Sequence, residues 1–162
     1  MKKCNTEIMK EIKKLEEYKI ALLNNERSSC TVTYALDEEP LESDYNFDLI
    51  DEKIEWYDNE IRRLKGLLAH SNVTTIVEGF NMTISEALIY LAQLKQKENR
   101  YDFLLSKKKL TRTSGYGDRM VEFTKILYDQ DKIYDECAKL KEIIAQLQMA
   151  IDRTNLTNMI DC

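Results

Sequence analysis

Two long segments carry apolar residues at alternating steps of three and four, and this feature constrains the fold more than any other. Between Tyr45 and Ala69 the residues at these steps are Phe47, Ile50, Ile54, Tyr57, Ile61, Leu64 and Leu68. Between Gln130 and Arg153 they are Ile133, Cys137, Leu140, Ile144, Leu147 and Ile151. A repeat that averages 3.5 residues predicts long helices that pack against other helices with left-handed crossings.

Two further segments have helical periodicity with one polar interruption each. The first runs from about Asn5 to Arg27 and carries Ile8, Ile12, Leu15 and Leu22. The second begins at Ile84, after a capping box formed by Thr83 and Glu86, and runs to about Lys107 with Ala87, Leu91, Leu94, Tyr101 and Leu105. Lys19 and Glu98 fall on these apolar stripes. We expect each to form an ion pair in the core or to extend to its edge.

The low number of backbone-breaking residues favours the same fold class. Only one proline and four glycines occur in 162 residues, which argues against a turn-rich sandwich or barrel. The sequence predicts a single helical domain over 1–162, all-α, formed by an antiparallel bundle of four long helices. Tyr-Asp and Leu-Lys pairs recur in the second and fourth helices, so the domain is interpreted as two helical hairpins, with duplication of 1–72 and 83–158 as one alternative.

Three connecting segments lack helical periodicity. Residues Cys30 to Leu36 alternate with a period of two, which indicates a short strand or an extended arm. Residues Asn72 to Met82 flank a turn at Glu78-Gly79 and predict a small β-hairpin. Residues Val121 to Tyr128 are compatible with a strand or with the start of a helix.

Nothing in the sequence predicts secretion, membrane insertion or a cofactor. No apolar stretch has the length of a signal peptide core or of a transmembrane helix. A cytoplasmic location is therefore expected, and the four cysteines, which form no closely spaced pair, are expected to be free thiols in that reducing compartment. The single histidine, His70, cannot build a multi-histidine metal site, and no metal, cofactor or catalytic residue is predicted.

Charge is divided unequally between the connecting segments. From residue 37 to 52 there are eight acids and no base, namely Asp37, Glu38, Glu39, Glu42, Asp44, Asp48, Asp51 and Glu52. From residue 95 to 125 nine bases face four acids. These segments are predicted to dock within one chain, to dock between chains, or to be two unrelated solvated loops.

The candidate binding site lies in the basic part of the chain. Around Ser114-Gly115-Tyr116-Gly117-Asp118 the sequence carries Lys107, Lys108, Lys109, Arg112 and Arg119. Cations beside an aromatic ring are typical of an anion or single-strand nucleic-acid contact, and a solvated loop is the alternative. A formal net charge of −5 opposes non-specific nucleic-acid binding.

Several short motifs together resemble a known family. They are Leu22-Leu23-Asn24, the acidic loop around Pro40, Asn72-Val73-Thr74-Thr75, Thr83-Ile84-Ser85-Glu86-Ala87-Leu88 and Ile151-Asp152-Arg153-Thr154-Asn155. The chain resembles small bacterial proteins of unknown function, some of which bear the name septicolysin. The resemblance implies a helical, cytosolic and oligomeric protein, and the name implies a cytolysin. His70-Ser71-Asn72 stands where the family has Arg-Thr-Asn, so no arginine is assigned a role there.

The function expected from the sequence is a non-enzymatic homo-oligomeric scaffold or protein-interaction module. Leu49, Trp56 and Leu67 lie off the heptad stripe and indicate a second buried face, most simply against another copy of the chain. A twofold homodimer is the simplest assembly, and higher oligomers are also compatible. The alternatives are a membrane-active or pore-forming protein, as the family name implies, and a nucleic-acid- or anion-binding bundle that uses the basic 107–119 loop.

Overall fold

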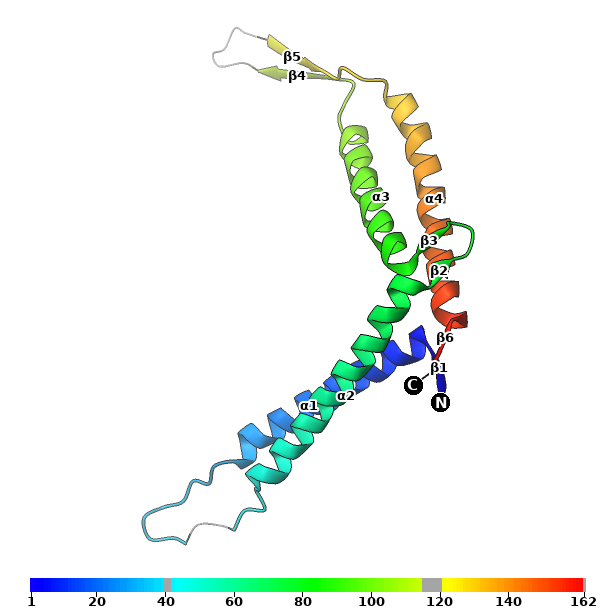
Figure 1. Cartoon of the computed structure of the whole chain (residues 1–162). Coiled ribbons are helices and arrows are strands. Elements are labelled where there is room, and N and C mark those ends of the chain that lie inside the picture. The colour runs from blue at the N-terminus through cyan, green and yellow to red at the C-terminus, as the bar shows by residue number, and fades with distance from the viewer. Residues whose placement is uncertain (40–41, 115–120, 162) are drawn as a thin grey trace. The chain divides into compact units, whose positions relative to one another are not determined.

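The protein is mostly helical, as the computed structural model shows (Figure 1). The structure describes residues 1–39, 42–114 and 121–161. Its helices are α1 (Asn5–Ser29), α2 (Phe47–Thr74), α3 (Ile84–Leu105) and α4 (Gln130–Thr157). The prediction of a mostly helical chain is therefore confirmed.

Three short strand pairs connect or close the helices. Strand β1 (Lys2–Cys4) pairs with β6 (Met159–Asp161), β2 (Ile76–Val77) pairs with β3 (Met82–Thr83), and β4 (Leu110–Ser114) pairs with β5 (Val121–Lys125). All three pairs are antiparallel. The predicted β-hairpin at Glu78-Gly79 is confirmed, and Gly79 has a φ of +85°, a conformation that costs glycine nothing.

The contacts divide the chain into two compact units. Unit 1 comprises Met1–Thr75 and Asn155–Cys162, and unit 2 comprises Ile76–Thr154. Each unit contains one helical hairpin with its own hydrophobic core. The duplication of 1–72 and 83–158 stays a prediction.

The core of unit 1 lies between α1 and α2, which run side by side (Figure 1). It consists of Ile8, Ile12, Leu15, Ile61 and Leu64. The predicted burial of Ile61 and Leu64 is confirmed, and Ile54 is partly buried. Burial ends at Leu15 on α1 and begins at Ile61 on α2, so the seam is less well covered towards the connector.

The core of unit 2 lies between α3, α4 and the β2–β3 hairpin. Its buried residues are Val77, Ile84, Ala87, Leu94, Leu140, Ile144, Leu147 and Ile151. The predicted burial of the α4 residues at positions 140, 144 and 147 is confirmed. Each helix supplies a stripe three and four residues apart, which buries a continuous surface without any fully apolar helix.

Lys19 and Glu98, the two polar residues on the apolar stripes, each form an ion pair with the other helix of their hairpin. Lys19 Nζ lies 2.6 Å from Asp58 Oδ1 on α2, and Lys141 Nζ lies 3.8 Å from Glu98 Oε1 on α3. Both lysines are partly exposed, so they cover the edge of the core with their aliphatic stems while the charge reaches water and a partner.

A capping box begins α3, as predicted. Glu86 N–H donates to Thr83 Oγ1 at 3.2 Å, and Thr83 N–H donates to Glu86 Oε2 at 2.7 Å. Two of the unpaired N–H groups at the helix start are thereby satisfied. Helices α2 and α4 continue beyond Ala69 and Arg153, the predicted ends of these two segments, to Thr74 and Thr157.

Candidate functional site

The basic residues that the sequence singles out lie at the base and on the strands of the β4–β5 arm in unit 2. Lys107, Lys108 and Lys109 connect α3 to β4, and Arg112 lies in β4. Arg119 falls outside the described residues, as do residues 115–118. The structure therefore brings the four described cations of the predicted site together at one end of unit 2.

The register of the arm sorts its side chains onto two faces. Leu110 is paired with Lys125, and Arg112 is paired with Phe123. Val121 lies two residues before Phe123 on β5. Directly paired residues of antiparallel strands share a face, and the face alternates along each strand. One face of the arm thus combines apolar and cationic residues.

The apolar-basic face has no cover from the described residues of unit 2. All five residues of β5 are exposed, and Phe123 keeps 62% of its surface in contact with water. The described part of the arm contains two strands, with no third strand beside them. Isolated two-stranded ribbons are marginally stable in water, so this face is suited to a partner.

The base of the arm is tied to the end of α3. Tyr128 Oη donates to Leu104 O at 2.6 Å, and Gln130 Nε2 donates to Lys107 O at 2.6 Å and to Leu105 O at 3.2 Å. These bonds satisfy carbonyl groups that a helix C-terminus leaves unpaired. Sequence reasoning missed Tyr128 and Gln130, because their acceptors lie more than twenty residues away along the chain.

The arm cations differ in how they are engaged. Lys107 Nζ lies 4.3 Å from the centre of the Phe103 ring, and Lys109 Nζ lies 3.5 Å from Asp131 Oδ2. Lys108, Arg112 and Lys125 form no ion pair with a described residue of unit 2. These three charges are available to an anionic partner.

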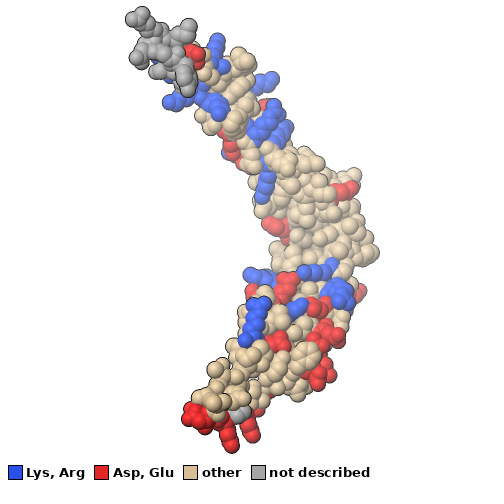
Figure 2. All heavy atoms as spheres, turned by 90° about the vertical axis from the view of Figure 1, so that its left-hand side faces the viewer, with Lys and Arg blue, Asp and Glu red and all other residues tan. Residues whose placement is uncertain are grey.

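The acidic segment forms the connector between α1 and α2 and the first turns of α2. All eight acids between residues 37 and 52 are exposed, and none pairs with a described cation of unit 1. Figure 2 shows acidic side chains gathered at the connector end of unit 1 and basic side chains gathered at the arm end of unit 2. The charge asymmetry of the sequence is thus concentrated at one end of each unit.

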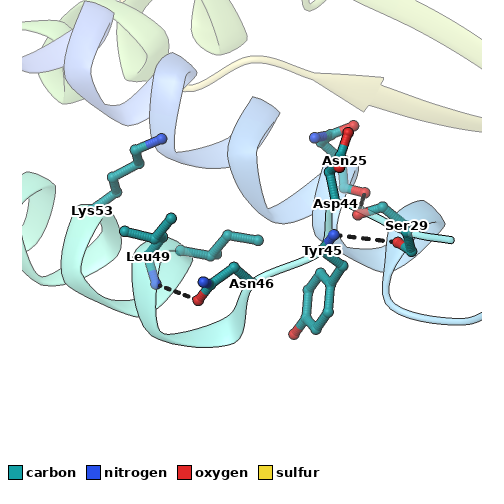
Figure 3. Close-up of a pocket in the computed structure, with 9 residues that line it drawn as sticks. Asn25, Ser29, Asp44, Tyr45, Asn46, Leu49 and Lys53 are labelled. Carbon is teal, nitrogen blue, oxygen red and sulfur yellow. Dashed lines mark hydrogen bonds between the residues drawn. The ribbon is translucent and has the colours of Figure 1, made fainter.

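A pocket of about 270 Å³ lies where the connector meets the hairpin of unit 1 (Figure 3). Asn25 and Ser29 of α1, Asp44 of the connector and Lys53 of α2 are among the residues that line it. Most of the polar side chains that line it form hydrogen bonds within unit 1. Asn46 Oδ1 accepts from Leu49 N–H at 3.2 Å and caps α2.

The phenol of Tyr45 is anchored beside this pocket. Tyr45 Oη donates to Glu26 Oε1 at 3.0 Å. Partial burial, together with this bond to a carboxylate, raises the pKa of Tyr45 above its ordinary value. The phenol therefore stays protonated and fastens the connector to α1.

A second, smaller pocket of about 130 Å³ lies in unit 2 beside the buried Cys137. Cys137 Sγ lies 3.9 Å from Asp102 Oδ1, and Lys141 Nζ lies 3.7 Å from the same carboxylate oxygen. The Asp102 carboxylate is the main cause that raises the pKa of Lys141. A protonated lysine paired with two carboxylates is suited to holding α3 and α4 together.

Neither pocket gathers the side chains that a metal ion needs. Within residues 1–39, 42–114 and 121–161, no group of three or more His, Cys, Asp and Glu residues is arranged to hold a metal. His70 is exposed on α2. In the same ranges, no helix is both long enough and apolar enough to cross a membrane.

Comparison with known proteins shows the fold alone. No protein-family model matches the chain, and no curated protein matches it. The chain is similar to the crystal structure of a functionally unknown conserved protein from Corynebacterium diphtheriae, with 18% identity and a TM-score of 0.67. The match covers 99% of this chain and 100% of the other. Membership of the septicolysin-named family stays a prediction, and what the comparisons establish is that the chain shares its fold with a conserved bacterial protein.

Proposed function

We propose that the protein is a non-enzymatic, homo-oligomeric helical scaffold that works through protein–protein contacts. The observation that carries this proposal is an exposed apolar flank on α2. Leu49 and Trp56 are 54% and 58% exposed. Seven residues separate them, which places both on one side of α2, away from the seam of Ile61 and Leu64.

Trp56 contacts the ring of the next residue on α2. Its ring meets the ring of Tyr57 edge-on, with 5.2 Å between the centroids and 71° between the planes. Tyr57 in turn packs against the core of unit 1. A tryptophan has only two side-chain torsions to order on binding, and it is enriched among the residues that dominate interface energies.

The polar groups near the pockets support a structural role over catalysis. Asn46 caps α2, Tyr45 anchors the connector, and Asp102 pairs with Lys141. Each of these side chains is already engaged in holding the fold.

A specific self-association interface would bury at least about 1,000 Å² in total.

Two further expectations belong to the same proposal. The heptad seams of α2 and α4 support an antiparallel bundle as the packing of the four helices. The described cysteines, Cys4, Cys30 and Cys137, are free thiols, which fits a cytoplasmic location.

A charge placed on the α2 flank tests the proposal. In Trp56→Glu the glutamate would be buried against the second copy, so we expect the dissociation constant to rise by at least about tenfold in sedimentation velocity. Val73→Glu is the matched control, because Val73 lies on the same helix and is also 58% exposed, but lies off this flank. Equal effects of the two substitutions would refute the flank as the interface.

A further inference from the structure

We propose that the apolar-basic face of the β4–β5 arm docks on the acidic connector of a second copy of the chain. This inference rests on the proposed self-association and deepens it, because it names a surface on each copy that contacts the other copy. The docking surface is an unpartnered sheet face, and its occupant is formed by residues 34–39 and 42–52 of another copy.

The arm offers cations and apolar groups on one face. The register places Arg112 and Lys125 beside Leu110, Val121 and Phe123. The three apolar residues are exposed, and the two cations have no ion-pair partner among the described residues of unit 2. The other face of the arm carries Thr111, Glu122 and Thr124, which are polar or acidic.

The connector offers the complementary combination. Its eight carboxylates occur together with four exposed apolar side chains, namely Tyr34, Leu36, Phe47 and Leu49. Leu36 has no cover at all from the rest of unit 1. The acidic and apolar groups of the connector are thus complementary in charge to the basic and apolar groups of the arm.

The two segments carry net charges of opposite sign, which attract each other. Residues 37–52 carry eight acids and no base, and residues 107–125 carry six bases and two acids. Complementary charge of this kind accelerates encounter and selects orientation, and it discriminates against like-charged surfaces. The same distribution opposes contacts between two arms or between two connectors.

A second copy of the chain can supply both a connector for the basic arm and an arm for the acidic connector. Every copy carries one arm and one connector, so a twofold dimer contains the contact twice. A nucleic acid would satisfy the cations but would leave the acidic connector and its apolar residues unmatched, and the net charge of −5 opposes it.

Charge reversal with mixing tests the inference. The arm variant carries Arg112→Glu and Lys125→Glu, and the connector variant carries Glu39→Lys and Glu42→Lys. Each alone is expected to self-associate at least about tenfold more weakly than the wild type, because like charges then face each other. An equimolar mixture of the two variants is expected to form a heterodimer with an affinity near that of the wild-type dimer.

A matched control separates this contact from a general effect of charge. Lys95→Glu with Lys10→Glu changes the net charge by the same amount as the arm variant, at exposed positions on α3 and α1 outside the arm and the connector. This variant is expected to self-associate within about threefold of the wild type, since scattered surface charges are screened. Circular dichroism confirms that each variant keeps its helical content.

Each contrary outcome has a distinct meaning. If the mixture stays dissociated while one chain carrying both reversals associates normally, the arm docks on the connector of its own chain and the inference is wrong. If the wild type self-associates and neither reversal weakens it, the inference fails and the proposed function stands. A monomeric wild type refutes both. Binding of a single-stranded oligonucleotide that the arm reversal abolishes, with self-association unchanged, also overturns the inference.

Discussion

Ser71 donates its hydroxyl hydrogen to Asn5 Oδ1 at 2.9 Å, which joins the last turn of α2 to the first residue of α1. Both side chains are buried. Asn5 Nδ2 donates to Asn155 Oδ1 at 3.0 Å, and Asn158 Nδ2 donates to Ser71 Oγ at 2.9 Å. This network links the beginning of the chain, the end of α2 and the end of the chain within unit 1.

Asn5→Ala should destabilise the protein through this network. The substitution removes the acceptor of the buried Ser71 hydroxyl and the donor to Asn155 Oδ1, and an unsatisfied buried polar group costs about 1–3 kcal/mol. Urea unfolding followed by circular dichroism measures the loss. Asn24→Ala, at an exposed position of the same helix, should change the free energy of unfolding by less than about 0.5 kcal/mol. Equal losses in the two variants would show that the network contributes nothing.

Leu147→Ala should show how much the core of unit 2 contributes. Leu147 is fully buried, so its truncation should cost about 2–5 kcal/mol by lost transfer energy and by the cavity left behind. Leu156 lies on the same helix and is 59% exposed, so Leu156→Ala should have an effect of less than about 1 kcal/mol. A smaller loss for Leu147→Ala than for Leu156→Ala would contradict the heptad assignment of α4.

The stability of the α3 start should depend on pH. The backbone N–H of Thr83, and then its hydroxyl, lower the pKa of Glu86 below its ordinary value of 4.5. A lowered folded-state pKa stabilises the fold above pH 4.5, and this contribution is lost as the pH falls through the lowered value. Glu86→Gln keeps an acceptor without the charge, so its deficit against the wild type should shrink as the pH falls from 7 to below 4.5.

A second capping carboxylate gives an internal check on that pH dependence. Cys4 N–H donates to Glu7 Oε2 at 2.8 Å and lowers the pKa of Glu7 in the same way. Glu7→Gln should therefore lose its deficit over the same range of pH. Thermal unfolding at a series of pH values measures both variants, and deficits that stay constant between pH 7 and pH 3 would argue against charge-assisted capping.

Vesicle leakage separates the scaffold from the lysin that the resemblance implies. The exposed faces of the helices carry charges of both signs, which suits water better than the interior of a bilayer. Micromolar protein should therefore release no dye from vesicles of phosphatidylcholine and phosphatidylglycerol, whereas a lytic peptide added as a control releases it. Dye release at low protein concentration would favour the pore-forming alternative.

The sequence predicted the parts of the fold that depend on local periodicity. Heptad steps located α2 and α4, and the Thr83–Glu86 capping box located the first residue of α3. These signals lie within a few residues of each other, so no knowledge of distant contacts is needed to use them.

The features that sequence reasoning missed depend on partners far along the chain. Ser71 and Asn72 look like a helix end, but Ser71 is satisfied by Asn5, 66 residues away, and α2 continues to Thr74. Strands β1 and β6 pair the two ends of the chain. Neither strand has a local pattern that distinguishes it from a disordered terminus.

The candidate site was predicted in composition but not in geometry. The sequence identified Lys107, Lys108, Lys109 and Arg112 as a basic group, and left Val121–Tyr128 open between strand and helix. Only the register of β4 against β5 shows that Arg112 shares a face with Phe123. Pairing of strands is a tertiary property, because a short alternating run is also compatible with other structures.

The mass of the wild-type protein in solution tests the central claim most directly. Multi-angle light scattering at micromolar concentration should give a multiple of the chain mass of 19.1 kDa, and twice that value for the twofold dimer. Raising the salt concentration should shift the equilibrium towards the single chain, because the proposed arm–connector contact is electrostatic. A mass of 19.1 kDa throughout the micromolar range would contradict the account.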